Sequence, residues 1–391
     1  MQTCRRCIYD ESLPSISFDD QGICNYCRTH DALDRQHPTG AEGERRLLAL
    51  ADEIKAAGKG KPYDCIMGVS GGCDSSFLLY KLKELGLRPL AAHFDNTWNS
   101  AIATTNIRRM TEALDIDLFT YVVNNREYDD IYRAFMTAGV PDIEAPTDIG
   151  LATTQYLAAQ KYGIKYIIEG HSFRTEGISP LGWSYMDGRY VKSVHQQYGT
   201  RPMETFPNLT LARQLKWMMV NRLKRVRPLY HLDYKKDHAM RLLKEKFGWQ
   251  WYGGHHLENR FTAFYHRYFM PMRFGIDTRL LGYAALVRSG QMERAEALAL
   301  MQTSPFDNQD VRDLVALVQK RLGYRDNEFL ALMNAPKRTY REFPNYKRTF
   351  ERLRPFFWAM YKLDLVPQSF YMKYTRPDPT TTARPALNGP A

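Results

Sequence analysis

The residues with the clearest chemical meaning are Ser70-Gly71-Gly72-Cys73-Asp74-Ser75, which lie between an apolar run and an amphipathic segment. Adjacent glycines let backbone N–H groups approach an anion closely, the serines add hydroxyl donors, and a helix N-terminus adds positive partial charge. The motif is not a Walker A loop, because no Gly-Lys-Ser/Thr follows. An aspartate is tolerated among phosphates when a divalent cation lies between them, so we expect Asp74 to bind Mg²⁺ directly or through water.

A second group of reactive residues lies near the N-terminus, where Cys4 and Cys7 are followed by Cys24 and Cys27 after 16 intervening residues. Two such pairs aim four thiolates at one ion, and we expect structural zinc because four thiolates leave no open coordination position. An iron–sulfur cluster and free thiols are the alternatives. The polar stretch between the pairs indicates a short hairpin, so the module at 1–30 needs its metal to fold.

The elements that position the glycine-rich motif alternate between strand and helix patterns after residue 60. Apolar runs and helical spacing predict strands at 63–70, 90–95, 117–124 and 164–169, and helices at 74–85, 106–114 and 148–162. This alternation predicts an α/β fold, a doubly wound parallel sheet with helices on both faces. Ligands bind such sheets at the carboxyl ends of the strands, where residues 70–75, Asp95 and Gly170-His171-Ser172 are expected to meet.

Composition divides the chain into five segments. The zinc module at 1–30 is followed by a polar helical linker at 31–60 and the sheet domain at 61–204. Residues 205–373 are mostly helical in pattern and rich in Arg, Tyr, Met and Trp, which indicates a region for the acceptor or a partner. Residues 374–391 are rich in Pro and Thr and poor in apolar residues, so we expect a disordered tail there.

The net charge of +11 is unevenly distributed. Residues 1–195 carry 21 basic and 26 acidic side chains, whereas residues 196–391 carry 33 basic and 17 acidic ones. The segment 213–246 alone has 11 basic and 3 acidic residues. Such asymmetry points to an anionic partner, which leaves nucleic acid, a membrane surface, a phosphorylated substrate and a merely solvated face open.

Other features exclude whole classes of protein. No run approaches the ~18 apolar residues of a membrane-spanning helix, so we expect no transmembrane segment. The N-terminus MQTCRRCIYD has no apolar core of a signal peptide, and six cysteines are too few for a disulfide scaffold. These observations favour a cytoplasmic protein.

The motif SGGCDS, placed at a strand–helix junction with Asp95 ending the next strand, resembles the loop of PP-loop ATP pyrophosphatases. This superfamily of adenine nucleotide alpha-hydrolase-like enzymes includes GMP, NAD and asparagine synthetases and tRNA thiolases. The resemblance implies cleavage of ATP between its alpha and beta phosphates and adenylation of a carbonyl oxygen. It also implies that ATP contacts the residues at the loop and strand ends, namely Val69, Ser70, Gly71, Gly72, Asp74, Ser75, Asp95 and Gly170.

Further stretches resemble the N-acetyl sugar amidotransferases, which make acetamidino sugars for bacterial surface polysaccharides such as the O-antigen of lipopolysaccharide. They are HFDNTWNS (93–100), APTDIG (145–150), IIEGHSFRTEG (167–177), GWQWYGGHHLENRFTAF (248–264) and RFGIDTR…SGQMERAEAL (273–298). The similarity covers roughly residues 1–300, including the cysteine pairs. It leaves the acceptor sugar open.

The resemblance places the turn at Gly170-His171-Ser172 near the alpha phosphate or the acceptor, and side-chain chemistry suggests further candidates. His171 would stabilise phosphate charge or carry a proton, with a structural hydrogen bond as the alternative. Lys192 would clamp the pyrophosphate. Arg174 and Glu176 follow His171 and suit a phosphate or the acceptor, although Arg174 equally suits a salt bridge. Four further residues could reach the sugar or its diphosphate, namely His256, Glu258, Arg260 and Arg279. The alternative is that they simply start a helix.

Together these features predict an ATP- and Mg²⁺-dependent amidotransferase that adenylates the acetamido group of a nucleotide-activated sugar and lets ammonia displace AMP. No cysteine has a glutaminase signature, so a separate glutaminase, with or without a channel-forming subunit, is expected to supply ammonia. The alternative is a tRNA-modifying enzyme of the thiolase type. With four of six cysteines assigned to zinc, too few thiols remain for that chemistry, and we do not expect a nucleic-acid partner. A third possibility is a scaffold without turnover, which the intact loop argues against.

Overall fold

The computed structural model describes residues 2–180, 183–254, 256–306, 308–363, 365–366 and 368–376. Within them, five parallel strands form one sheet in the order β3-β2-β1-β4-β5. The strands are β1 (Cys65–Gly68), β2 (Pro89–Asp95), β3 (Leu118–Val122), β4 (Tyr166–Ile168) and β5 (Lys224–Val226). The predicted doubly wound parallel sheet is therefore confirmed.

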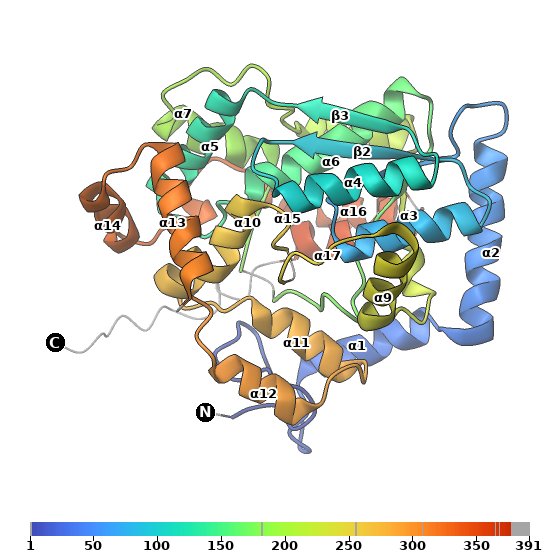
Figure 1. The fold of residues 1–391 in the computed structure, drawn as a ribbon, viewed down its shortest axis with the longest axis horizontal. Coiled ribbons are helices and arrows are strands. Elements are labelled where there is room, and N and C mark those ends of the chain that lie inside the picture. Colours follow the sequence, from blue (N-terminus) through green and yellow to red (C-terminus); the bar gives the residue numbers. More distant parts are fainter. Residues whose placement is uncertain are drawn as a thin grey trace.

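Alternation along the strands gives the sheet two apolar faces, each covered by helices (Figure 1). Ile66 and Ile167 belong to the core on one face, whereas Met67 and Ile168 belong to the core on the other. The first face is covered by α5 (Asn125–Ala138), α6 (Ala145–Lys161) and α7 (Gly188–Tyr198). The second is covered by α2 (Gly40–Ala57), α3 (Cys73–Glu84), α4 (Ala101–Ala113) and α9 (Lys236–Phe247).

The fifth strand corrects the predicted boundary at residue 204. β5 pairs with β4 through Lys224, Arg225 and Val226, although the whole segment from 205 was expected to be helical and separate from the sheet. The charge of β5 prevented its recognition as a strand in the sequence. Arg225 lies at the edge of the sheet, where it forms an ion pair with Glu169. Between α7 and α9 the chain also forms α8 (Leu211–Leu215), the π-helical η1 (Lys216–Val220) and the 3-10 turn η2 (Pro228–Tyr230).

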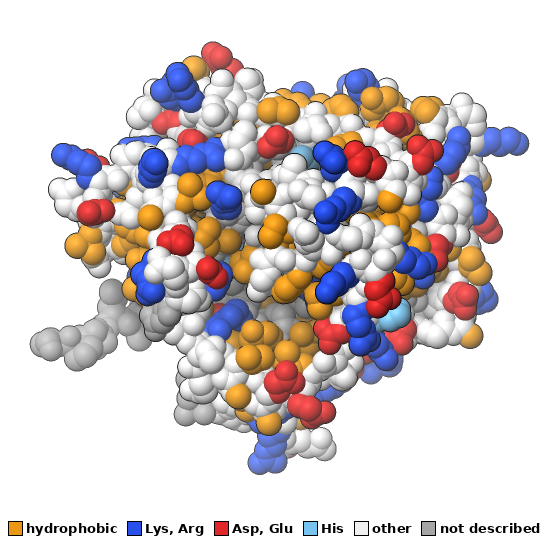
Figure 2. All heavy atoms as spheres, viewed as in Figure 1, with side chains coloured by type: hydrophobic (Ala, Val, Ile, Leu, Met, Phe, Trp, Pro, Cys, Tyr) orange, Lys and Arg blue, Asp and Glu red, His pale blue; other side chains and the backbone are white. Residues whose placement is uncertain are grey.

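Part of the basic segment 213–246 forms ion pairs with acidic residues elsewhere in the chain. Glu169 binds both Arg225 and Arg227 at 2.5 Å, and Glu53 lies 3.3 Å from Lys224. On the face shown in Figure 2, Lys and Arg side chains are interspersed with Asp and Glu rather than gathered in one patch. These ion pairs use only part of the segment's positive charge, because eight of its 11 basic side chains are exposed.

The C-terminal part of the described chain is helical, as expected, and wraps around one end of the sheet domain (Figure 1). Its elements are α10 (Arg260–Phe264), η3 (Tyr265–Phe274), α11 (Arg279–Arg288), α12 (Arg294–Gln302), α13 (Gln309–Leu322), α14 (Asp326–Asn334), η4 (Tyr340–Glu342), α15 (Lys347–Arg352), α16 (Arg354–Lys362) and α17 (Gln368–Thr375). Because α17 reaches Thr375, the first two residues of the predicted tail are helical, and its bulk, 377–391, lies outside the described residues. No helix of the described chain is long and apolar enough to cross a membrane.

The N-terminal cysteine module packs against α11 and α12, far from it in sequence (Figure 1). Arg294 donates hydrogen bonds to the carbonyl oxygens of Cys4 and Cys7, at 2.9 and 3.0 Å. From the module the chain continues into α1 (Asn25–Gln36) and α2, which match the predicted helical linker. The module is therefore fixed to the C-terminal helices rather than to the sheet.

Candidate active site

The glycine-rich loop connects β1 to α3 and is shaped for close approach. Gly71 has a φ of +79°, and a Cβ there would meet the carbonyl oxygen of Ala103 at 2.3 Å, so only glycine fits. The Gly71 carbonyl accepts hydrogen bonds from Trp249 Nε1 at 3.1 Å and Asn106 Nδ2 at 3.2 Å, which fix the loop from outside. Gly72 is the N-cap residue of α3 and has no side chain to cap it, which leaves the positive end of the helix open to an anion.

This loop lies at the switch point of the sheet. The chain runs outward from β1 to β3, then returns to β4 on the other side of β1, so the loops after β1 and β4 diverge. Between them is a cavity of about 190 Å³. Its lining comes from three distant parts of the sequence: Ser70, Gly72, Asp74, Ser75, Gly170, His171, Glu176, Tyr252, His256 and Glu258.

Asp74 is held by two residues that the sequence analysis did not single out. The Tyr234 hydroxyl donates a hydrogen bond to Asp74 Oδ1, and Lys236 Nζ lies 3.6 Å from Oδ2. Burial lowers and the Asp74 carboxylate raises the pKa of Lys236, and the balance is upward, so this lysine stays charged. A fixed cation next to the loop suits a phosphate, and the aspartate keeps it in place.

The remaining acids fit a divalent cation. Burial and the nearby Asp74 charge raise the pKa of Glu176 to about 8, and Glu258 Oε2 is buried without a partner among the described residues. Neighbouring carboxylates that lack enough hydrogen-bond donors repel one another, and a bound Mg²⁺ reduces this repulsion. Phosphate oxygens and water usually complete the coordination shell of the ion. Asp74, with Glu176 and Glu258 beside it, therefore fits the expected Mg²⁺.

His171 follows β4 and borders the same cavity. Its Nδ1 lies 3.2 Å from the Tyr230 hydroxyl, and burial together with Arg227 lowers its pKa to about 4. The imidazole is therefore neutral near pH 7 and offers one N–H donor and one acceptor nitrogen. It can orient a phosphate oxygen or accept a proton, but it does not supply a fixed positive charge.

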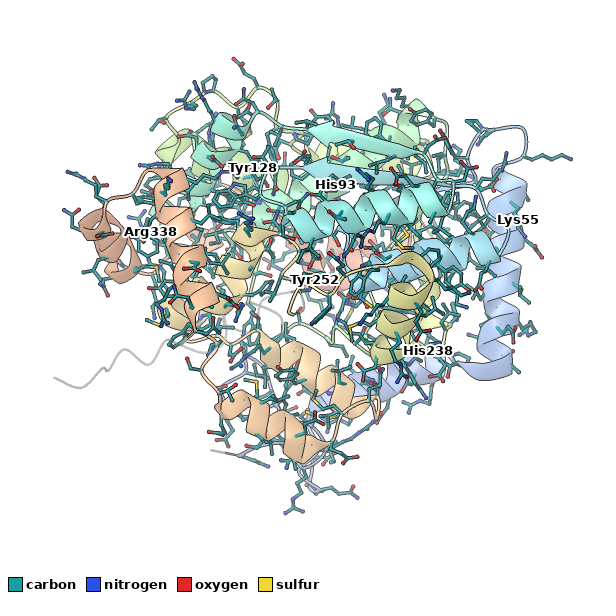
Figure 3. The ribbon with its side chains drawn as sticks, viewed as in Figure 1. Lys55, His93, Tyr128, His238, Tyr252 and Arg338 are labelled. Carbon is teal, nitrogen blue, oxygen red and sulfur yellow. The ribbon has the colours of Figure 1, made fainter. Side chains whose placement is uncertain are left out.

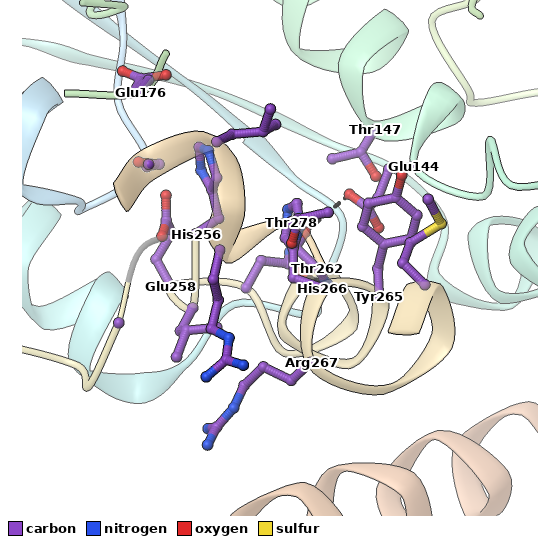
Figure 4. Close-up of a pocket in the computed structure, with 18 of the residues that line it drawn as sticks. Glu144, Thr147, Glu176, His256, Glu258, Thr262, Tyr265, His266, Arg267 and Thr278 are labelled. Carbon is purple, nitrogen blue, oxygen red and sulfur yellow. Dashed lines mark hydrogen bonds between the residues drawn. The ribbon is translucent and has the colours of Figure 1, made fainter. Parts of the chain in front are cut away.

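A larger cavity of about 840 Å³ continues from the small one (Figure 4). The two share Ser70, His171, Glu176, His256 and Glu258, and the larger extends to the starts of α6 and α11. His256 stands at their junction with a left-handed φ of +58°, and its ring stacks on His266 at 5.3 Å between centroids. Backbone strain at a non-glycine residue is characteristic of functional sites. Tyr252, labelled in Figure 3, lines only the smaller cavity, where its hydroxyl lies close to Gly72 at the start of α3.

The cysteine cluster is separate from these cavities and has the geometry of a metal site. All four sulfurs are buried and lie within 4.8 Å of one another, with nearest separations of 3.6, 3.7 and 3.8 Å. A tetrahedral ion with metal–sulfur bonds of about 2.3 Å places its thiolates about 3.8 Å apart. A polynuclear iron–sulfur cluster needs wider spacing, because its thiolates bind different irons. The four cysteines therefore fit a single zinc ion.

Comparison with known proteins identifies a family match within the C-terminal helices. Residues 258–355 match the family described as LPS biosynthesis protein WbpG-like, C-terminal domain. That WbpG-like region begins at Glu258, which borders both cavities, and includes α10 to α15. The C-terminal helices are thus similar to a domain of lipopolysaccharide biosynthesis proteins.

Other similarities are more distant. An uncharacterized protein of Methanocaldococcus jannaschii, MJ1599, is 28% identical to this chain over 170 residues. The aligned residues make up 43% of this chain and 58% of the length of that relative. NMN synthetase from Francisella tularensis aligns over 72% of this chain and 94% of its own, at 13% identity and a TM-score of 0.31. NH3-dependent NAD synthetase from Campylobacter jejuni aligns over 53% and 93%, at 14% identity and a TM-score of 0.26. At these scores the fold assignment rests on the strand order itself.

Besides Gly71, which lies within the loop itself, four residues that the sequence placed in the site line neither cavity. Asp95 ends β2, where its Oδ1 accepts a hydrogen bond from the Thr97 N–H at 2.8 Å and so caps a turn. Lys192 is exposed on α7. Arg260, in the WbpG-like region, is exposed at the start of α10, where it bonds through its backbone N–H to the Trp98 carbonyl. These three side chains therefore lie outside both cavities, and the roles expected for them stay predictions.

Arg174 is the fourth, and its role is structural. Its guanidinium donates to Asp34 Oδ1 and to the carbonyl oxygens of His37 and Tyr230, each at 2.8 Å. These bonds join the connection between α1 and α2 to η2, and they use the donors that a phosphate would need. Arg279 of the WbpG-like region does border the larger cavity, where Asp277 holds it at 2.6 Å.

Lys236 lies next to the glycine-rich loop, where Lys192 was expected to bind the pyrophosphate. Removing its charge with Lys236→Met is expected to lower kcat/KM for ATP by about 10- to 100-fold, because one cation near the phosphates is lost. Lys192→Met is the matched control and should change kcat/KM by less than about twofold. Steady-state AMP formation measures both, and equal losses in the two variants would contradict this assignment.

Glu144, at the start of α6, makes stability depend on pH. Burial and the neighbouring Asp148 raise its pKa from 4.5 to about 8. Between these two pKa values the folded chain holds a proton that the unfolded chain releases. The contribution of Glu144 to the free energy of unfolding is therefore complete below pH 4.5 and is lost as the pH rises through 8. We expect the free energy of unfolding to fall between pH 6 and pH 9, by at most about 3 kcal/mol from this residue. Urea unfolding of wild type and Glu144→Gln checks it: the variant should show a flatter pH dependence.

Proposed function

We propose that this protein is the synthetase subunit of an ATP-dependent amidotransferase that converts the acetamido group of a nucleotide-activated sugar into an acetamidino group. One observation carries the proposal: the SGGCDS loop at the switch point opens directly into a cavity of about 840 Å³. This volume accommodates a nucleotide together with a second substrate. The similarity of 258–355 to a lipopolysaccharide biosynthesis domain supports a surface-glycan precursor as that substrate.

In the first step, the acetamido oxygen attacks the alpha phosphorus of ATP, and the bond to the pyrophosphate oxygen breaks. The products are an O-adenylyl imidate, pyrophosphate and the proton released from the amide nitrogen. The backbone N–H groups of the loop, the N-terminus of α3 and Lys236 would stabilise the departing pyrophosphate. Mg²⁺ bound at Asp74 would neutralise phosphate charge.

In the second step, ammonia attacks the imidate carbon and the carbon–oxygen bond to AMP breaks. The nitrogen loses one proton as the acetamidine forms. The neutral His171, which borders both cavities, would accept a proton through its free nitrogen. His256 at the junction would position the acetamido group between the loop and the larger cavity.

Ammonia would come from a separate glutaminase subunit. All six cysteines of the chain are buried, and four of them form the metal cluster. Burial raises the pKa of Cys73 to about 12, so this thiol is a poor nucleophile. The same property argues against persulfide chemistry of the tRNA thiolase type.

An assay of AMP formation tests the proposal. The purified chain would receive ATP, Mg²⁺ and ammonium with either a panel of nucleotide-activated acetamido sugars or total tRNA. AMP released only with a sugar nucleotide supports the proposal, and AMP released only with tRNA refutes it. Replacing ammonium by glutamine should abolish product formation until a glutaminase is added, and turnover of glutamine by the chain alone would refute the separate-subunit part.

A further inference from the structure

The larger cavity has a region away from the glycine-rich loop whose chemistry differs from that near the phosphates. We call it the inner arm and define it by Glu144, Thr147 and Asp148 at the start of α6, and Thr262 and Tyr265 on α10 and η3. None of these residues borders the small cavity beside the loop. In Figure 4, Glu144, Thr147 and Tyr265 gather on one side and Glu176 and Glu258 on the other, with His256 nearer to the latter pair.

Hydrogen-bonding capacity in the inner arm is only partly used. Glu144 Oε2 accepts a hydrogen bond from Thr262 Oγ1 at 2.9 Å, whereas Glu144 Oε1 is buried with no partner among the described residues. Asp148 is surrounded by protein and borders the larger cavity. The exposed surface of its side chain therefore faces that cavity. An unpaired buried oxygen destabilises the folded chain, and a bound donor relieves that cost.

The inner arm suits a neutral ligand. Burial raises the pKa of Glu144 to about 8 and that of Asp148 above its ordinary value, so near pH 7 Glu144 retains much of its protonated form and can donate as well as accept. The arm also has apolar walls, formed by Phe94, Leu151 and Met270. Carboxyls and hydroxyls beside apolar surface match a polyhydroxylated ring, whose faces are apolar and whose edges carry hydroxyl groups.

We infer that the inner arm binds the pyranose ring of the acceptor, with ring hydroxyls bonded to Glu144 and Tyr265, so that the acetamido group lies at His256 and faces the loop. This inference rests on the proposed function for the identity of the acceptor. It follows from the continuity of the cavity, because the reacting group must reach the alpha phosphate beside the loop.

Equilibrium binding without turnover tests this assignment on the full chain. Calorimetry would compare UDP-, dTDP- and GDP-linked acetamido sugars with UDP, dTDP and GDP. At least one sugar nucleotide should bind at least about tenfold more tightly than its own diphosphate. Glu144→Gln and Tyr265→Phe should each reduce that preference by about tenfold and leave the affinity for the diphosphate and for ATP within about threefold.

Three results would overturn the inference: no sugar nucleotide binds better than its diphosphate, both variants keep the wild-type preference, or both ligands weaken equally. Tyr265→Phe removes a single oxygen and guards against misfolding, and Lys192→Met is the surface control. The AMP assay separates this inference from the proposed function. A variant-sensitive sugar preference without AMP formation would refute the reaction and keep the site. Sugar-dependent AMP formation with an unchanged sugar KM in Glu144→Gln would do the reverse.

Discussion

The variant Asp74→Asn is expected to lower ATP-dependent AMP formation by about 10³-fold or more, with little change in folding. The substitution removes the carboxylate that would bind Mg²⁺ and leaves Lys236, 3.6 Å away, without its counter-charge. Tyr234, which donates to the same carboxylate, keeps an acceptor in the amide oxygen, so packing is preserved. Steady-state AMP release at saturating acceptor measures the effect.

Asp95→Asn is the matched control for that variant. Asp95 is an aspartate at the same edge of the sheet, and its side chain accepts from the Thr97 N–H, which an asparagine oxygen does equally well. We expect AMP formation within about threefold of wild type. Equal losses in the two variants, or near-normal activity of Asp74→Asn, would contradict the role assigned to Asp74.

Removal of the metal from the cysteine cluster is expected to have the largest effect on stability. Cys24→Ser should lower the zinc content from one per chain toward zero and lower the Tm by more than about 10 °C, because the module has only its metal and its contacts with α11 and α12 to hold it. Arg288 is buried and donates to Cys7 Sγ at 3.2 Å, so protonated thiols would leave its charge without a counter-charge.

The loss should extend to the active site. Helix α11 carries Arg288 at its end and supplies Arg279 and Leu281 to the wall of the larger cavity, so a displaced module alters that wall. We therefore expect a raised acceptor KM in any Cys24→Ser protein that remains folded. Elemental analysis and thermal unfolding make the measurement, with Cys73→Ser, outside the cluster, retaining one zinc. A full-length protein without zinc, or an unchanged Tm in Cys24→Ser, would exclude a structural metal.

Local sequence patterns were sufficient where the chemistry is local. The SGGCDS loop and the cysteine pairs each bring their functional atoms together within a few residues, and the strands at 63–70 and 164–169 are apolar because both faces of the sheet are covered. The short β5 could not be recognised, because at the edge of the sheet two of its three residues are charged and paired with Glu53 and Glu169.

The assignment of cations depended on tertiary structure. Arg174 follows the turn after the fourth predicted strand and Lys192 follows a later Gly/Asp-containing turn, and both were expected to bind phosphate. In the fold, Arg174 is used to join α1 and α2 to η2, and α7 carries Lys192 to the surface. Lys236 reaches Asp74 from α9, which packs against α3, and the sequence marks it only as one of many basic residues.

The sequence by itself determined that the chain has a parallel α/β sheet with a phosphate-type loop and a four-cysteine site, because both motifs act through backbone geometry and spacing over short distances. Tertiary structure decided which distant residues join them. Glu144, Tyr265 and His256 come together with the loop only because α6, η3 and the segment after α9 converge at the carboxyl edge of the sheet. The burial of Glu144, and hence its raised pKa, is a property of that convergence and not of its neighbours in sequence alone.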